Sequence, residues 1–277
     1  MELLKDKIIF ITGGSEGIGY ECAKAYATEG AKVVIAALNE DRINEAVYEL
    51  GASHLGIYCD VSIASDVKNA IEKTIQTYGR IDAIHNNAGI ATPSKPLHQT
   101  TDEEWNNLMN VNLKGVYHTI KYGFEALQNS QGCILNTSSL VGEIGQEMHA
   151  AYTATKGGIN ALTKSMALDY AKYKIRVNAV SPAGVWTQTL RKWNAEQPGD
   201  VNMEAYLNGI HPLGYCPNGD VVADVCVFLL SDKARFITGC IMPVSGGAEL
   251  GYRNVNSEYH SDRDETINRN HEIPFDK

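Results

Sequence analysis

Short apolar runs alternate with longer segments of helical spacing along most of the chain. Seven short runs are predicted to be strands, of which the first is rich in β-branched residues: Lys7–Thr12, Lys32–Ala36, His54–Cys59, Ala83–Asn86, Cys133–Thr137, Arg176–Val180 and Ile241–Val244. Helical spacing separates them, over residues 17–28, 40–50, 63–78, 102–128, 151–173 and 220–231. Such alternation is typical of a parallel sheet with helices on both faces. The sequence therefore predicts an α/β fold of three layers, a doubly wound parallel sheet between two layers of helices.

The length of the chain, 277 residues, allows one large domain or two small ones. No linker and no internal repeat interrupts the alternation before about residue 250, so we expect one domain over residues 1–250. Residues 251–277 are rich in Asn, Asp, Glu, Arg and His. They are expected to form a polar tail, disordered by itself or draped over a neighbouring subunit.

Charge and composition exclude several classes of partner. The chain has 24 Lys and Arg against 33 Asp and Glu, a net charge of −9 that would repel a nucleic acid. No signal peptide is evident, and no apolar stretch approaches the roughly 20 residues that span a bilayer. The six cysteines form no C-x-x-C pair, and the eight histidines show no metal-ligand spacing. We expect a cytoplasmic protein with free thiols, no bound metal, and no membrane or nucleic-acid partner.

A glycine-rich turn, T-G-G-S-E-G-I-G over residues 12–19, links the first predicted strand to the first helix. Glycines allow a tight turn there, and the backbone N–H groups at a helix N-terminus attract phosphate. A turn that binds nothing stays possible from this motif alone, but its position after the first strand favours a Rossmann-like dinucleotide site. The residues of this turn that are expected to contact the cofactor are Gly13, Ser15, Glu16, Gly17, Ile18 and Gly19.

The end of the second predicted strand bears on the choice between NAD and NADP. An acidic residue that holds the adenosine ribose is expected there, yet the strand runs into Ala37, Leu38 and Asn39. Glu16 disfavours a 2′-phosphate, whereas Arg42 is the one nearby cation that could favour it. The sequence favours NAD and leaves NADP open.

Tyr152 and Lys156 are four residues apart, on one face of a predicted helix. A tyrosine pKa near 10 is too high for a base at neutral pH, but a nearby ammonium stabilises the phenolate and lowers that pKa. Alone, this spacing also fits two ordinary residues of a helix surface. With this pair, the sequence predicts a tyrosine acid/base whose pKa is lowered by a lysine.

Three further polar motifs follow predicted strands: Asp60-Val61, Asn86-Asn87-Ala88-Gly89, and Ser138-Ser139 after Ile134–Thr137. The carboxyl ends of the strands are where open α/β sheets bind ligands. Together with the glycine turn and the Tyr152/Lys156 pair, these motifs resemble the short-chain dehydrogenase/reductase family over residues 5–250. The resemblance implies an NAD(P)-dependent oxidoreductase that moves a hydride between an alcohol and the nicotinamide.

The resemblance also implies a role for each matching residue. Tyr152 is similar to the family's general acid/base, Lys156 to the residue that lowers its pKa and binds the nicotinamide ribose, and Ser139 to the residue that binds the reacting oxygen. Asn112 resembles the asparagine of a water-linked proton relay to Lys156. Further cofactor contacts are implied for Asp60, Val61, Asn87, Ala88, Gly89, Pro182, Val185 and Thr187. The family usually has Pro-Gly where this chain has Pro182-Ala183, which is a departure in the nicotinamide segment.

Finer likeness concerns the substrate. The runs at 138–146, Trp186-Thr187 and 246–252 resemble a subgroup that oxidises sugars such as L-fucose or hydroxysteroids. Gln146 and Trp186 are expected to join Ser139 and Tyr152 in binding substrate. Glu143, Glu147 and His149 add polar groups that suit a polyol, unless they are solvated loop residues. We expect an aldose dehydrogenase, with a hydroxysteroid or other alcohol dehydrogenase or ketoreductase as the alternative.

Four further expectations concern a cover over the substrate, the role of His85, the assembly of the protein and an alternative function. Residues 190–215, which include Trp193, Pro198 and Gly199, are expected to cover the substrate as a lid or as an ordinary surface excursion. His85 is expected to be packed or hydrogen-bonded. The resemblance implies a homotetramer that pairs the helices near 102–128 and 151–173. A sensor or assembly module that binds NAD without turnover is the alternative from another class.

Overall fold

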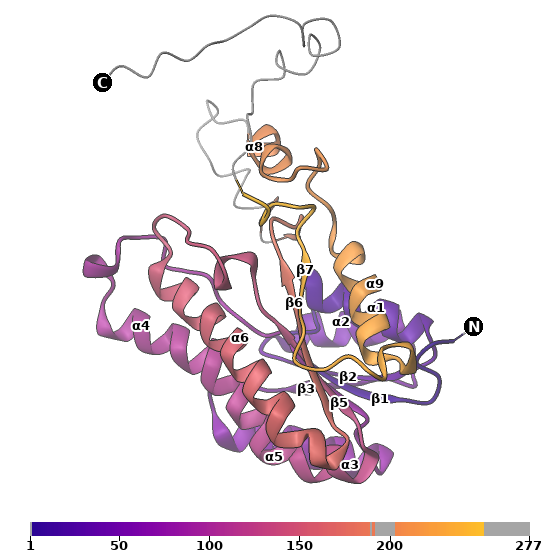
Figure 1. The fold of residues 1–277 in the computed structure, drawn as a ribbon. Helices are drawn as coiled ribbons and strands as arrows, with labels where there is room; N and C mark the ends of the chain where they lie inside the picture. The colour runs from indigo at the N-terminus through magenta and orange to yellow at the C-terminus, as the bar shows by residue number, and fades with distance from the viewer. Residues whose placement is uncertain (1, 189, 192–202, 252–277) are drawn as a thin grey trace, which may run out of the picture.

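The central element of the structure is a seven-stranded sheet (Figure 1). The computed structural model describes residues 2–188, 190–191 and 203–251. The strands are β1 (Ile8–Thr12), β2 (Lys32–Ala37), β3 (Leu55–Tyr58), β4 (Ala83–Asn86), β5 (Cys133–Thr137), β6 (Arg176–Pro182) and β7 (Ile241–Val244). They lie in the order β3-β2-β1-β4-β5-β6-β7, and every pairing is parallel. The predicted doubly wound parallel sheet is confirmed, with strand bounds within two residues of those expected.

Helices cover both faces of this sheet (Figure 1). One layer contains α1 (Gly17–Thr28), α2 (Glu40–Leu50) and α9 (Gly219–Leu230). The other contains α3 (Ala64–Tyr78), α4 (Asp102–Met109), α5 (Gly115–Ser130) and α6 (Ala150–Tyr170). The three-layer architecture expected from the sequence is therefore present.

Successive side chains of the strands pack alternately against the two helix layers. On β1, the buried side chains of Ile9 and Ile11 pack toward α1 and α9, whereas Phe10 between them packs toward α3 and α5. On β2, Val33 and Val34 divide in the same way. Because successive side chains of a strand point to opposite faces, a continuous apolar run serves two cores at once.

The helical segment predicted at 102–128 is interrupted in the structure. α4 ends at Met109, a π-helical turn spans Asn110–Lys114, and α5 begins at Gly115. Such a turn adds one residue to the helix without breaking its apolar face, so the spacing of apolar residues did not reveal it. The structure also has α8 (Met203–Ile210), a helix not expected within 190–215. Trp193, Pro198 and Gly199 lie outside the described residues.

The winding of the chain changes direction at β1, because β2 lies on one side of β1 and β4 on the other. Ligands of open α/β sheets bind at such a switch point, beyond the carboxyl ends of the strands. Among the described residues, no helix is both long and apolar enough to cross a membrane. All six cysteines are free thiols.

Candidate active site

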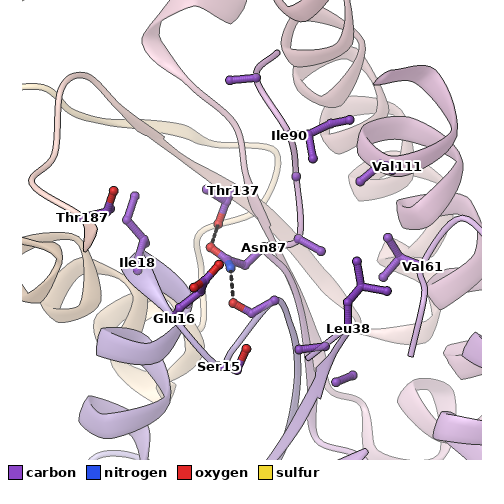
Figure 2. Close-up of a pocket in the computed structure, with 18 of the residues that line it drawn as sticks. Ser15, Glu16, Ile18, Leu38, Val61, Asn87, Ile90, Val111, Thr137 and Thr187 are labelled. Atoms are coloured by element: carbon purple, nitrogen blue, oxygen red, sulfur yellow. Dashed lines mark hydrogen bonds between the residues drawn. The ribbon is translucent and has the colours of Figure 1, made fainter. Parts of the chain in front are cut away.

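A cleft of about 790 Å³ opens at the carboxyl ends of the strands (Figure 2). It collects the glycine turn before α1, the ends of β2 to β6, and the start of α6. The predicted cofactor and catalytic residues that line it are Gly13, Ser15, Glu16, Gly17, Ile18, Gly19, Asp60, Val61, Asn87, Ala88, Gly89, Ser139, Tyr152, Lys156, Pro182 and Thr187. Residues that lie far apart in the sequence thus meet in one site.

The glycine turn forms the floor of one end of the cleft. Gly13 and Gly17 have φ of 63° and 58°, in the left-handed region that favours glycine. A Cβ atom at Gly19 would lie 2.1 Å from the Gly13 carbonyl oxygen, so no larger residue fits there. The first residues of α1 face the cleft, and no side chain caps the helix at Glu16. Its unpaired N–H groups are suited to bind the phosphates of a dinucleotide.

Asn87, just after β4, fastens this turn to the sheet (Figure 2). Its amide nitrogen donates to the carbonyl oxygens of Thr12 and Gly13, each at 3.1 Å. Its backbone N–H and that of Ala88 both donate to the Thr12 hydroxyl, at 3.0 and 3.1 Å. The predicted contact region at 87–89 is therefore joined directly to the predicted phosphate-binding turn.

Lys156 lies in the wall at the other end of the cleft. Its side chain is 4% exposed, and Nζ donates to the carbonyl oxygen of Thr137 at 2.7 Å. Burial lowers the pKa of Lys156 to about 8, because a buried ammonium is poorly solvated. The lysine is thus held in place by the backbone at the end of β5, with its ammonium 5.7 Å from the centre of the Tyr152 ring.

Tyr152 and Ser139 form the polar pair expected from the sequence. Burial raises the pKa of Tyr152, and the Ser139 hydroxyl lowers that pKa by less, so the net direction is upward. The sequence instead predicted a pKa lowered by Lys156. The difference has a structural reason, since the Tyr152 side chain is buried and its burial is the larger effect on the pKa. In this arrangement Tyr152 is a neutral phenol at neutral pH and can donate a proton.

Asn112 is buried beside the cleft, within the π-helical turn. Its amide donates to the Ile90 carbonyl oxygen at 2.9 Å and to the Thr155 hydroxyl at 3.0 Å, and its Oδ1 accepts from Ile90 N–H at 2.9 Å. These bonds join the π-helical turn to the segment after β4 and to α6. The side chain therefore sets the relative position of three elements that line the cleft.

Among the described residues, the part of the cleft at the end of β2 has neither an acidic side chain on the strand nor an unpaired cation beside it. Leu38 is 61% exposed there, and Asn39 caps α2 by accepting from Arg42 N–H at 2.9 Å. The Arg42 guanidinium donates to Gln188 at 3.2 Å and lies 3.8 Å from Glu45. Arg42 and Lys156 are the cations among the described residues that line the cleft.

Besides Asn112, three predicted residues do not line this cleft. Val185 is buried among apolar side chains near α9. Trp186 lies in an adjoining cleft with the guanidinium of Arg191 5.0 Å from its ring centre. Gln146 is exposed on the segment before α6. The nearest polar link to Tyr152 on that segment is His149, whose ring centre is 6.4 Å from that of Tyr152 and whose Nε2 is 2.8 Å from the Ser94 hydroxyl.

The sequence argument missed several residues that line the cleft. Ile90 and Val111 supply apolar walls, and Leu38 and Thr137 complete the two ends (Figure 2). Each of these residues lies next to a motif that the sequence analysis identified, so its closeness to that motif in the sequence could have pointed to it. Ile90, for example, directly follows Gly89.

The lining residues fit a nicotinamide dinucleotide. Backbone N–H groups at the start of α1 suit its phosphates, and the glycines leave room for close approach. Apolar side chains from Ile18, Ile90 and Val111 offer flat contacts for rings. Ser139 and Tyr152 line the same cleft, so they would be available to a substrate bound beside such a cofactor.

Known proteins are similar to this chain in sequence and fold. A family model described as enoyl-(acyl carrier protein) reductase matches residues 13–249. L-fucose dehydrogenase of Bos taurus is 38% identical over 246 residues, which cover 89% of this chain and 90% of the relative.

Solved structures agree with these matches. The 3-ketoacyl-(acyl-carrier-protein) reductase of Brucella melitensis complexed with NADH has a TM-score of 0.82 and 30% identity, covering 89% of this chain and 99% of its own. The aldohexose dehydrogenase of Thermoplasma acidophilum has a TM-score of 0.82 and 32% identity, covering 91% and 97%. The chain therefore belongs to the short-chain dehydrogenase/reductase family and is an NAD(P)-dependent oxidoreductase.

Proposed function

We propose that the protein is an NAD-dependent dehydrogenase of aldoses, which oxidises the anomeric hydroxyl of L-fucose or a similar sugar. The observation that carries the proposal is the placement of Ser139, Tyr152 and Lys156 at one end of a cleft whose other end is the glycine turn. A bound nicotinamide would accept the hydride from the sugar or return it. Proton transfer and the orientation of the substrate are carried out by side chains of the protein.

The proton is handled by Tyr152. In the direction of reduction, its neutral phenol donates a proton to the carbonyl oxygen. In oxidation, Tyr152 first gives up its own proton through the relay proposed below, and the phenolate then accepts the hydroxyl proton of the sugar. Ser139, which lines the cleft with Tyr152, binds the reacting oxygen and orients it. Lys156 stabilises the phenolate once it forms, because its ammonium is close to the ring and poorly solvated.

Asn112 is proposed to organise a water-linked proton relay to Lys156. Its amide already bridges Ile90 and Thr155, so its own position is fixed. In the oxidation of a sugar, a relay of this kind would carry away the proton that Tyr152 has accepted and so restore the phenolate after each turnover. The proposed cofactor contacts are those predicted from the sequence, with Val185 acting through its packing and not through contact.

Two kinds of observation support a sugar as the substrate. The bovine relative is an L-fucose dehydrogenase and the Thermoplasma protein an aldohexose dehydrogenase. Exposed polar residues of the segment before α6, Glu143, Gln146 and Glu147, together with His149, can hydrogen-bond a polyol.

The test is a panel of aldoses and hydroxysteroids assayed with NAD. We expect NADH formation with at least one aldose and a lower kcat/KM for every steroid alcohol. Turnover of a steroid alcohol with no turnover of any aldose would remove the sugar hypothesis while keeping the dehydrogenase.

The proposal extends to the assembly and location of the protein. We propose a cytoplasmic homotetramer that pairs the helices near 102–128 and 151–173. Exposed apolar side chains on α5 and α6, Tyr117, Leu162 and Leu168, support a covered face there. Light scattering should then give about 121 kDa, four times the mass of the 30.3 kDa chain. Residues 1–250 are proposed as one domain and 251–277 as its polar tail.

A further inference from the structure

His85, on β4, has no part in the proposed chemistry yet is a fully buried polar side chain. Its Nδ1 lies 2.9 Å from the Tyr26 hydroxyl of α1, and its Nε2 lies 2.9 Å from the Thr137 hydroxyl of β5. Burial lowers the pKa of His85 to about 3, so the ring is neutral at neutral pH. A neutral imidazole has one N–H, and the question is which nitrogen carries it.

The answer begins at Asn87, at the far end of the same chain of contacts (Figure 2). Both hydrogens of its amide nitrogen are used, because Nδ2 donates to the carbonyl oxygens of Thr12 and Gly13. Carbonyl oxygens only accept, so this amide has a single allowed orientation. Asn87 Oδ1 then faces the Thr137 hydroxyl at 3.2 Å and must accept from it.

The direction of every other bond follows. The Thr137 hydroxyl has one hydrogen and gives it to Asn87, so this hydroxyl accepts from His85 Nε2–H. Because the ring is neutral, His85 Nδ1 carries no hydrogen and accepts from the Tyr26 O–H. The result is one directed chain, from Tyr26 through His85 and Thr137 to Asn87, in which each donor is used. Hydrogen bonds linked in this way polarise and strengthen one another.

We propose that His85 and Tyr26 are positioning residues of the cofactor site, acting through Thr137 to fix the amide of Asn87 beneath the glycine turn. The proposal rests on the proposed cofactor contacts of that turn. The amide is packed tightly there, since a Cβ at Gly19 would lie 2.4 Å from Asn87 Nδ2. A rotated amide would place its oxygen against the two carbonyl oxygens and push the turn away. The hydrogen-bond chain from Tyr26 to Asn87 therefore sets the shape of the glycine turn that is proposed to bind the phosphates.

A buried metal site is the competing explanation for the same region. Single ligand atoms of Cys22, His85 and Cys226 lie within 4.8 Å of one another. Both ring nitrogens of His85 are already in hydrogen bonds, however, and burial raises the pKa of Cys22 well above its ordinary value. A metal would need a free ring nitrogen and deprotonated thiols, so the hydrogen-bond chain fits better.

The first test is the tautomer of His85, read from ¹⁵N NMR of the full chain without cofactor. The His85→Gln variant assigns the signals by their loss. We expect hydrogen on Nε2 and none on Nδ1, unchanged by EDTA. Hydrogen on Nδ1, on both nitrogens, or a spectrum altered by EDTA would overturn the proposal, the last in favour of the metal. Because this readout needs no cofactor, it is independent of the proposed function.

The second test is the dissociation constant of NAD, measured by calorimetry. His85→Leu removes both bonds and should weaken NAD binding by about tenfold, the value of one lost hydrogen bond. His85→Gln offers one donor and one acceptor at its tip and should restore binding to within about threefold. Tyr26→Phe removes only the first bond and should give an intermediate loss.

A purely structural role predicts a different pattern. Leu127→Ala creates a cavity in the other core and is the control for lost stability, with NAD affinity expected to be unchanged. Saturating NAD should return kcat of the His85→Leu variant to within about twofold of wild type, since the defect is in binding. Equal affinity in His85→Leu and wild type, or equal losses in the Leu and Gln variants, would overturn the proposal. Failure of the wild type to bind NAD would count against the proposed function alone.

Discussion

The ammonium of Lys156 is bonded to the carbonyl oxygen of Thr137 at 2.7 Å while lying 5.7 Å from the centre of the Tyr152 ring. The end of β5 therefore holds the cation that the tyrosine of α6 needs. Since Thr137 also contacts His85 and Asn87, one residue connects the proton-handling end of the cleft to the glycine turn.

Lys156 should make stability depend on pH in a defined direction. Burial lowers its pKa from 10.5 to about 8, so between these values the unfolded chain binds a proton that the folded chain lacks. Its unfavourable contribution is complete below pH 8 and disappears as pH rises toward 10.5. Relative to Lys156→Met, wild type should gain about 2 to 4 kcal/mol of unfolding free energy between pH 7 and 10.5.

Urea unfolding of both proteins across this range measures the effect. Lys68→Met removes an exposed lysine of α3 and serves as the control, with no comparable change expected. Parallel stability profiles for wild type and Lys156→Met would show that the lysine is not desolvated as described.

Gly19 should tolerate no side chain. The Cβ of alanine would lie 2.1 Å from the Gly13 carbonyl oxygen and 2.4 Å from Asn87 Nδ2, so the turn must move. Gly19→Ala is expected to weaken NAD binding by at least about 100-fold and to lower stability by roughly 1 to 3 kcal/mol. Gly209→Ala, on α8 with nothing within 4 Å of the new atom, is the matched control: NAD affinity should be unchanged and stability should not fall, because alanine favours a helix more than glycine does. Normal NAD affinity in Gly19→Ala would contradict the described turn.

Leu38 should decide the cofactor preference. Wild type is expected to favour NAD, because Leu38 gives a 2′-phosphate no charged partner and Arg42 is held by Gln188. Leu38→Arg should shift the ratio of kcat/KM for NADP over NAD upward by at least about tenfold, since a guanidinium binds phosphate in two places. Tyr48→Arg adds the same charge on an exposed face of α2 and should leave the ratio unchanged. A tenfold preference of wild type for NADP would refute the choice of NAD.

Much of the fold and the site could be predicted from local sequence. Alternating apolar segments determined the sheet because burial on both faces requires continuous apolar strands, as at Ile9 and Phe10. Polar motifs after strands, such as Asn87 and Ser139, were placed in one cleft because parallel strands bring their carboxyl ends together.

Other features depend on contacts between distant segments. The bond from Lys156 to Thr137 and the chain through His85 join residues from separate strands and helices, so no spacing in the sequence reveals them. The π-helical turn around Asn112 changes the helix by one residue, too little to alter its apolar pattern. The upward pKa of Tyr152 follows from burial, which the four-residue spacing to Lys156 does not report.

The central claim is that Tyr152 handles the proton in an NAD-dependent oxidation of a sugar, and one measurement tests it most directly. NADH formation from L-fucose and NAD is followed for wild type and Tyr152→Phe, together with the NAD dissociation constant of each. We predict a kcat at least about 100-fold lower in the variant, with NAD affinity within about threefold of wild type. A variant that keeps more than about a hundredth of the wild-type kcat would contradict the account.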